Sequence, residues 1–321
     1  MKNIFQILIS FTICYTICAL FVSGYSYNGT LTRGVLLEWF PDLDNRTELI
    51  LKINFNITSI DPTAFSGLAK LNILDLSVNK IQSLDPNTFN DLTNLTALSF
   101  YINSLKAIDP LTFRNLKNLT YINLMDNFIT NIFPDTFTNL TNLNSIILSS
   151  NRLTYVNETL FRGLTNLTYI ALSYNEITSI PATLFRGLSK VDTIDLYMNQ
   201  IETLDPDVFN DQAATLKSLI LSANLFRSFH PNFFDKFANL TLLDLNYNKL
   251  VRLENNMFQN LSSVEKIFLY KNELVFIQKE IFHGLINLQV VELRINPICY
   301  VDPSYVEKLC DTNPNCKIYY R

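Results

Sequence analysis

Apolar and polar positions along this chain follow a pattern that returns every 24 residues. Three successive copies read LNILDLSVNKIQSLDPNTFNDLTN (71–94), LTALSFYINSLKAIDPLTFRNLKN (95–118) and LTYINLMDNFITNIFPDTFTNLTN (119–142). In each copy a short run alternates between inward apolar and outward residues and then reaches an asparagine, which is typical of a short β-strand before a turn. The pattern therefore predicts one strand per copy, for example over residues 146–148 in the fourth copy.

Nine copies lie in register from residue 71 to residue 287, and the copy over residues 191–215 is one residue longer than the others. An imperfect copy precedes them and an incomplete copy follows, so about eleven copies span residues 49–298. Stacked parallel strands lie about 4.8 Å apart, and no single copy can bury its apolar face alone. The copies are therefore expected to stack into a one-dimensional array with specialised ends.

The consensus LxxLxLxxNxIxxLxPxxFxxLxx resembles the extracellular type of leucine-rich repeat over residues 49–298. Nine copies in register make this resemblance far more specific than a single short motif. The chain is similar in this respect to Toll-like receptor ectodomains, slit-type guidance proteins, variable lymphocyte receptors and secreted immune proteins of invertebrates. The resemblance implies an α/β repeat fold, a leucine-rich-repeat horseshoe solenoid with a parallel concave β-sheet and a mostly irregular or short-helical convex side.

A column of phenylalanines recurs at one position of the repeat and is expected to form an aromatic spine on the convex side of the core. Burying each ring is worth roughly 1.5–3 kcal/mol. The members of this column are Phe65, Phe89, Phe113, Phe137, Phe161, Phe185, Phe209, Phe234, Phe258 and Phe282.

A column of asparagines marks the point where each predicted strand turns. An asparagine side chain offers two N–H donors and an oxygen acceptor, enough to bond backbone groups of its own turn and of the adjacent repeat, as in the ladder of the resembled family. Replacing an inner member by alanine should cost about 1–3 kcal/mol of stability without a direct effect on binding. This structural ladder comprises Asn79, Asn103, Asn127, Asn151, Asn175, Asn199, Asn224, Asn248 and Asn272, with Asn56 and Asn296 in the same column at its ends.

The residues between the inward leucines are expected to point onto the concave face, where tyrosine and serine dominate. Tyrosine supplies a large amphipathic contact area at low entropic cost, so this mixture resembles a binding surface. A second interpretation is that tyrosine is present only because it suits β-strands. The candidate binding residues are Tyr101, Tyr121, Tyr169, Tyr174, Asp195, Tyr197, Asp244, Tyr247 and Tyr270.

Charge on this expected face changes along the array. Acidic residues, including Asp75, lie in its earlier part, whereas Lys266, Lys271 and Arg294 lie toward its end. This favours at most a mildly dipolar partner surface, and a solvated face is the alternative.

Composition bounds the function. Hydrophobic residues make up 48% of the chain and charged residues 17%, which predicts a folded protein. The net charge of -4 and the absence of any run of five Lys or Arg argue against a nucleic-acid partner. The sequence has two histidines and seven glycines and lacks nucleophile, P-loop and zinc-protease motifs, so we predict no enzyme, no cofactor and no bound metal.

Residues 1–24 are predicted to be a secretory signal peptide, with an apolar stretch over residues 4–22 and small residues suited to cleavage after Gly24 or Ala19. An uncleaved signal anchor is the alternative, since the stretch is near the length that spans a bilayer. After cleavage we expect no membrane span and an extracellular location.

The five cysteines lie near the two ends of the chain, and only those near the C-terminus are candidates for disulfides. Cys14 and Cys18 would leave with the signal, and three disulfide candidates, Cys299, Cys310 and Cys316, would remain in an oxidising compartment. Any one pairing leaves a thiol over, which permits a dimer through an unpaired cysteine. The spacing matches no zinc site.

Caps are expected at both ends of the array. Residues 25–48 form a predicted N-terminal cap without cysteines, in which Trp39, Phe40 and Leu43 cover the first repeat. Residues 299–321 form a short C-terminal cap, and NPICY resembles the opening of the family's cap. That resemblance makes a disulfide from Cys299 to either Cys310 or Cys316 plausible.

Nine sequons lie outside the asparagine column and are candidates for glycosylation in a secreted protein. Several recur just before the predicted strands, so glycans there would shield one flank. These candidates are Asn28, Asn45, Asn94, Asn118, Asn139, Asn157, Asn166, Asn239 and Asn260.

The sequence therefore predicts a secreted leucine-rich-repeat glycoprotein that recognises an extracellular protein or glycan on its concave face. Roles in innate immunity, adhesion or signalling are all compatible with this prediction. A structural matrix or dimerising protein, or a truncated receptor ectodomain, is the alternative.

Overall fold

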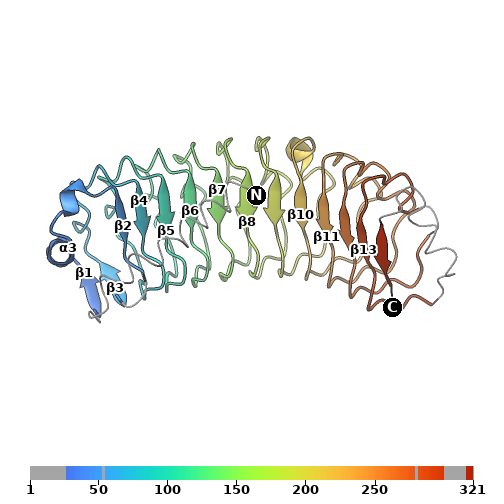
Figure 1. Cartoon of the computed structure of the whole chain (residues 1–321), viewed down its shortest axis with the longest axis horizontal. Helices are drawn as coiled ribbons and strands as arrows, with labels where there is room; N and C mark the ends of the chain where they lie inside the picture. The colour runs from blue at the N-terminus through green and yellow to red at the C-terminus, as the bar shows by residue number, and fades with distance from the viewer. Residues whose placement is uncertain (1–26, 53–54, 279–280, 300–315, 321) are drawn as a thin grey trace.

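The structure, a computed structural model, describes residues 27–52, 55–278, 281–299 and 316–320. The chain forms an elongated array in which short strands lie side by side along the long axis (Figure 1). Residues 1–24, the predicted signal peptide, lie outside the described residues. Within the part of the chain that is described, no helix has the length and apolar character needed to cross a bilayer.

Twelve parallel strands form one sheet in the order β14-β13-β12-β11-β10-β9-β8-β7-β6-β5-β4-β2. Equivalent positions of successive repeats pair with each other in this sheet. For example, Ser145 lies opposite Tyr169, and Ile146 lies opposite Ile170. The strands are β2 (Glu48–Ile50), β4 (Ile73–Asp75), β5 (Ala97–Ser99), β6 (Tyr121–Asn123), β7 (Ser145–Ile147), β8 (Tyr169–Ala171), β9 (Thr193–Asp195), β10 (Ser218–Ile220), β11 (Leu242–Asp244), β12 (Lys266–Phe268), β13 (Val290–Glu292) and β14 (Lys317–Tyr319).

The middle residue of each repeat strand points into the core, which leaves the first and third residues on the open face. Leu74, Ile146 and Leu243 are all fully buried. This alternation follows from the two-residue period of a strand. The predicted solenoid with a parallel concave sheet is confirmed.

The members of the phenylalanine column are buried in the core behind the sheet, and most neighbouring rings are in contact. Phe113 and Phe137 stack with ring centroids 6.1 Å apart, and Phe258 and Phe282 stack at 6.0 Å. The longer copy contains the short 3-10 helix η2 (Asn210–Gln212), where the buried Gln212 amide donates to the carbonyl oxygens of Phe185 (2.7 Å) and Leu188 (3.1 Å). These bonds of Gln212 attach the longer copy to the repeat that precedes it.

The N-terminal end is covered by a small unit that holds β1 (Gly29–Leu31), the helix α3 (Arg33–Trp39) and the 3-10 helix η1 (Leu43–Asn45). Strand β1 pairs in parallel with β3 (Ile57–Ile60). The ring of Trp39 packs 4.8 Å from that of Phe55, and Phe40 also packs against the core. Leu43 is fully buried. Apolar contacts of these residues therefore cover the first repeat.

The C-terminal end differs from the prediction because β14 adds a last strand to the sheet, pairing Ile318 with Val291. Cys316, directly before β14, is disulfide-bonded, whereas Cys299 is a free, exposed thiol. The expected disulfide from Cys299 is therefore wrong. Cys316 lies where the strand begins, while Cys299 lies beyond the end of β13 and its backbone N–H bonds the Val275 carbonyl. Cys310 lies outside the described residues.

Candidate functional site

The asparagine column bonds neighbouring repeats to one another. Asn151 accepts from the Ile129 backbone N–H (3.0 Å) and donates to the carbonyls of Leu124 (2.9 Å) and Leu148 (3.1 Å). The same acceptor and donor pattern is made by Asn79, Asn103, Asn127, Asn175, Asn199, Asn224, Asn248, Asn272 and Asn296. Because the side-chain amides of these asparagines are bonded to backbone groups, the amides are not free to hold a ligand.

Asn56 does not follow this pattern. Its backbone is left-handed, with φ of 45°, and the Ile57 N–H that would start the next turn bonds Asn79 at 2.9 Å. The Ile57 carbonyl accepts from the Lys80 N–H as the Ile81 carbonyl accepts from the Ser104 N–H, so Ile57 is equivalent to Ile81 and Asn56 to Lys80, one residue past the ladder position. The extra residue in this first copy displaces Asn56 from the ladder.

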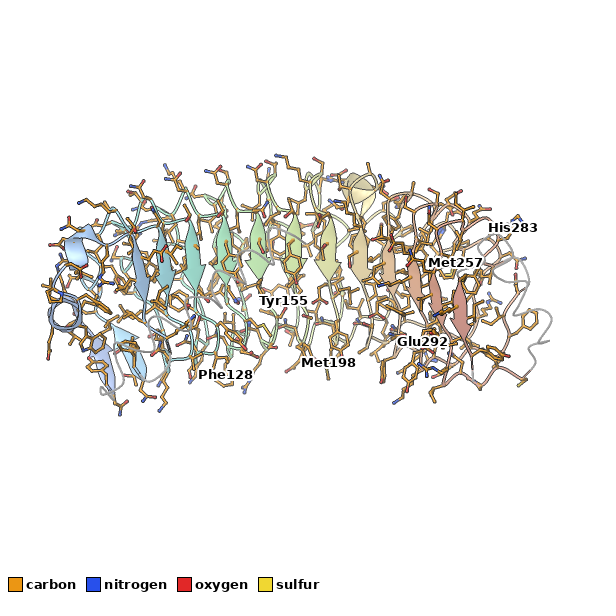
Figure 2. All side chains as sticks on the ribbon, in the orientation of Figure 1. Phe128, Tyr155, Met198, Met257, His283 and Glu292 are labelled. Carbon is orange, nitrogen blue, oxygen red and sulfur yellow. The ribbon has the colours of Figure 1, made fainter. Side chains whose placement is uncertain are left out.

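The residue immediately before each ladder asparagine has a left-handed backbone, which the sequence analysis did not detect. Its φ lies between 53° and 58° at Val78, Ile102, Asp126, Ser150, Tyr174, Met198, Ala223, Tyr247, Lys271 and Ile295. This conformation is uncommon for residues other than glycine and asparagine. It carries several side chains outward beyond the strand ends, and Figure 2 shows Met198 on that long edge of the array.

This geometry divides the predicted tyrosines into groups. Tyr174 and Tyr247 follow the strands and are 46% exposed. Tyr121 is only 4% exposed, and burial raises its pKa to about 12 while Asn123 donates to its hydroxyl at 3.2 Å. Tyr169 is half-buried, and burial also raises its pKa to about 12. Tyr121 therefore offers little contact area, whereas the edge tyrosines offer much.

Strands β8 to β12 bring six of the predicted residues together. The rings of Tyr174 and Tyr197 meet edge to face at 5.0 Å, and those of Tyr247 and Tyr270 lie 5.3 Å apart. We call the set Tyr174, Asp195, Tyr197, Asp244, Tyr247 and Tyr270 the tyrosine–aspartate patch. The other three predicted residues are outside this patch, since Tyr101 and Tyr121 lie in earlier repeats and Tyr169, on β8, is half-buried.

The two aspartates of the patch accept hydrogen bonds from their own strand ends. Asp195 accepts from the Tyr197 N–H at 2.9 Å, and Asp244 from the Asn246 N–H at 3.0 Å. Asp244 also accepts from the Ser222 hydroxyl at 2.9 Å. Burial raises the pKa of both carboxyl groups despite these bonds. The patch thus combines exposed rings with carboxylates that are partly withdrawn from water.

The sequon asparagines that precede the strands form a second ladder, which the sequence analysis did not predict. The side-chain N–H₂ groups of Asn94, Asn118, Asn166 and Asn239 each donate to a carbonyl of the preceding repeat at 2.8–2.9 Å. Asn142 makes the same bond at 3.0 Å although it is not in a sequon. The recurrence of asparagine in this column therefore has a structural cause that is independent of glycosylation.

The threonines of these sequons also serve the fold. The hydroxyls of Thr96 and Thr120 donate to backbone carbonyls one repeat earlier at 3.0 Å, and that of Thr241 does so at 2.9 Å. A glycan would replace one of the two amide hydrogens and leave the other free to donate, so the second ladder remains compatible with glycosylation.

The other sequon asparagines have more varied surroundings. Asn157 is half-buried and accepts from the backbone N–H and hydroxyl of Thr159 at 3.0 and 2.9 Å. Asn45 accepts from the Lys70 ammonium at 2.9 Å. The exposed sequon asparagines outside both ladders are Asn28, Asn45, Asn139 and Asn260.

The two histidines do not form a catalytic arrangement in the described residues. His230 and His283 are exposed on the outer part of their repeats, and Figure 2 places His283 near the C-terminal end of the array. Residues 27–52, 55–278, 281–299 and 316–320 hold no group of three or more His, Cys, Asp or Glu that could bind a metal ion.

The sequence matches the family described as "Leucine rich repeat" at residues 44–100, 101–153, 118–177, 141–199, 165–214 and 214–274. A search of curated proteins gave no match. Among solved structures, a leucine-rich-repeat protein of Leptospira interrogans is similar with a TM-score of 0.68 and 24% identity, covering 88% of this chain and 73% of that one.

Two solved complexes contain similar solenoids. A chain of the glycosylated Toll–Spatzle complex of Drosophila has a TM-score of 0.72 and 20% identity, over 92% of this chain and 41% of that one. A chain of the LRIM1/APL1C complex has a TM-score of 0.65 and 25% identity, over 83% of this chain and 51% of that one. The protein thus spans about half or less of the length of the chains it matches in these complexes.

Proposed function

Because the chain belongs to the leucine-rich-repeat family, typically non-enzymatic scaffolds for protein interaction, we propose that it is a secreted protein that binds another extracellular protein on its concave face. The edge of that face carries the tyrosine–aspartate patch. Exposed, mutually packed tyrosines supply contact area without the ordering cost of long flexible side chains. The paired, accessible tyrosines over β8 to β12 are the observation that carries the proposal.

The likeness to chains in two protein complexes supports a protein partner, although at this identity the likeness concerns the fold. The predicted signal peptide and the sequons support secretion. Glycans on the exposed sequons of the strand-start flank would leave the opposite edge, where the patch lies, free for a partner. The expectation that nucleic acid is not a partner rests on the charge pattern alone.

Affinity capture from a secretome tests the proposal. The bait is the wild-type protein beside a Tyr174→Ala, Tyr197→Ala, Tyr247→Ala variant, in which three patch tyrosines are removed, and we expect the variant to lose the captured protein. Tyr155→Ala is the matched control, because Tyr155 is 49% exposed but lies outside the strands. If the triple variant and the wild type capture the same proteins equally, the concave face is not the binding surface. Enzymatic deglycosylation of the secretome before capture separates a protein ligand from a glycan.

The free Cys299 thiol favours a second candidate function, a matrix or dimerising protein linked through that residue. In an oxidising compartment an exposed thiol pairs readily with a second chain. Non-reducing electrophoresis of wild type and Cys299→Ser tests this candidate. A covalent dimer that is present only in the wild type and collapses with reductant would favour it, and a monomer in both would exclude it.

A further inference from the structure

Acidic residues occur at the third position of four strands, and each performs the same local task. Asp75, Asp195, Asp244 and Glu292 each accept the backbone N–H two residues further along, at distances of 2.9–3.0 Å. The carboxylate therefore satisfies a backbone N–H group at the turn that follows its strand. Asparagine could do this equally well, because its side-chain oxygen can accept the same bond, as Asn123 does for the Met125 N–H at 2.9 Å.

The four carboxylates differ in whether a cation accompanies them. Asp75 lies 3.5 Å from the Lys52 ammonium, and Glu292 lies 2.6 Å from the Arg294 guanidinium. Among the described residues, no Lys, Arg or His lies within 4 Å of the carboxylate of Asp195 or Asp244, whose contacts are hydroxyls and backbone N–H groups. Partly buried carboxylates are destabilised until a cation accompanies them.

The neighbouring rings are suited to cations. The Lys271 ammonium already lies 5.1 Å from the centroid of the Tyr247 ring, within the range of a cation–π contact. The Tyr197 ring is on the same face, two residues after Asp195, which accepts the Tyr197 backbone N–H at 2.9 Å. Between the two aspartates, β10 presents Ile220, which is in register with both of them, and the turn that follows presents the small residues Ser222 and Ala223, which leave space beside the tyrosine rings. A long side chain of a partner can therefore reach the carboxylates between aromatic neighbours.

We propose that the tyrosine–aspartate patch binds two cationic side chains of the protein partner, one at Asp195 and one at Asp244. The aspartates lie on β9 and β11, two strands apart, so the two cations must be separated by roughly 10 Å. Arginine fits best, because its guanidinium can bond a carboxylate while its flat face lies against a tyrosine ring. The inference rests on the proposed function and specifies the chemistry of its partner.

A defined peptide tests this inference. The probe is Gly-Arg-Gly-Gly-Arg-Gly-amide with fluorescein attached to its N-terminal amine, and the matched control carries citrulline, which is neutral but similar in shape, at both arginines. We expect saturable binding of the arginine peptide, measured by fluorescence anisotropy, that weakens with added salt. The citrulline peptide should bind at least about tenfold more weakly.

Two protein variants locate the site. Asp195→Asn with Asp244→Asn should weaken binding of the arginine peptide at least about tenfold, while circular dichroism shows an unchanged fold. Asp126→Asn is the control, since it removes the same charge from the same side of the array three strands away, in the repeat of β6. No saturable binding to the wild type, or equal binding to the double variant, would overturn the inference.

The same variants separate this inference from the proposed function. If the tyrosine variant loses its captured proteins while the double asparagine variant retains all of them, the concave face binds a partner but not through cations. If neither set of changes alters capture, the proposed function itself fails.

Discussion

At the scale of the residue, the left-handed position before each ladder asparagine has the clearest energetic consequence. Val78 is β-branched and has φ of 57°. A β-branched residue is strained in this region, whereas asparagine enters it readily. The array therefore carries local strain at several of its turns, and this strain can be relieved one residue at a time.

Val78→Asn is expected to raise the free energy of unfolding by about 1 kcal/mol. Val275→Asn is the control, because Val275 is an exposed valine without a left-handed backbone. Thermal unfolding of both variants measures the difference. Equal destabilisation by the two substitutions would show that the backbone at Val78 is not strained.

Asn151→Ala should lower the free energy of unfolding by about 1–3 kcal/mol, because it leaves the Ile129 N–H of the buried turn unpaired and removes one of the two asparagine donors to the carbonyls of Leu124 and Leu148. Asn142→Ala, in the exposed second ladder, should cost less, since water can replace its bond. Urea denaturation checks the order of these two losses. Partner capture by either folded variant should remain as in the wild type.

The patch aspartates predict a pH dependence of stability with an unusual sign. In the folded state their pKa values are raised above the ordinary value of 3.8. Between the pKa of the unfolded chain and the raised pKa of the folded protein, the folded protein therefore binds protons more readily than the unfolded chain does. Stability contributed by these groups is therefore lost as pH rises through that window. Tyr169 and Tyr197, whose pKa values are raised from 10, stay neutral there.

Asp195→Asn with Asp244→Asn should consequently be more stable than the wild type at pH 7 and gain little near pH 3.5. Urea midpoints at the two pH values measure this difference, with Asp135→Asn, at an exposed aspartate without a left-handed backbone, as the control. A variant that is less stable than the wild type at pH 7 would mean that the folded protein stabilises these carboxylates.

At the scale of the element, the first repeat depends on the unit that precedes it. Trp39 at the end of α3 contacts Tyr27 and Phe55, with ring centroids 5.1 and 4.8 Å away. Trp39→Ala should cost about 2–4 kcal/mol and expose β1 and β3 to local unfolding. Leu37→Ala, on the exposed side of the same helix, should be nearly neutral. Hydrogen exchange should report faster exchange at β3 than at β7 in the tryptophan variant only.

Strand positions could be predicted because the inward residues recur with the repeat, so that Ile146 and Leu243 are placed by counting. The last strand, β14, could not be predicted because Lys317 has no earlier copy at a fixed distance to align with. Cys316 lies directly before that strand, so the spacing of the repeat did not indicate that Cys316 is disulfide-bonded and Cys299 is not.

At the scale of the whole molecule, the repeat determines which columns face outward but not how side chains pack between columns. Tyr121 and Tyr174 were both predicted to face a partner, yet one is covered by its neighbours and the other is exposed. Whether Asp195 has a cation nearby likewise depends on the residues of adjacent strands. The sequence could therefore predict which face of the solenoid is the candidate binding surface. Which residues of that face together form a site could be known only from the three-dimensional structure.

The two asparagine ladders hold each repeat at both ends of its strand, one through residues such as Asn151 and the other through residues such as Asn166. Because these bonds involve backbone groups, a substitution at an outward position between them leaves the main chain in place. Changes on strands that do not touch should then combine additively in their effect on affinity. The face can accordingly be altered at one position after another without renewed selection for folding, which is the property that a combinatorial library of binders requires.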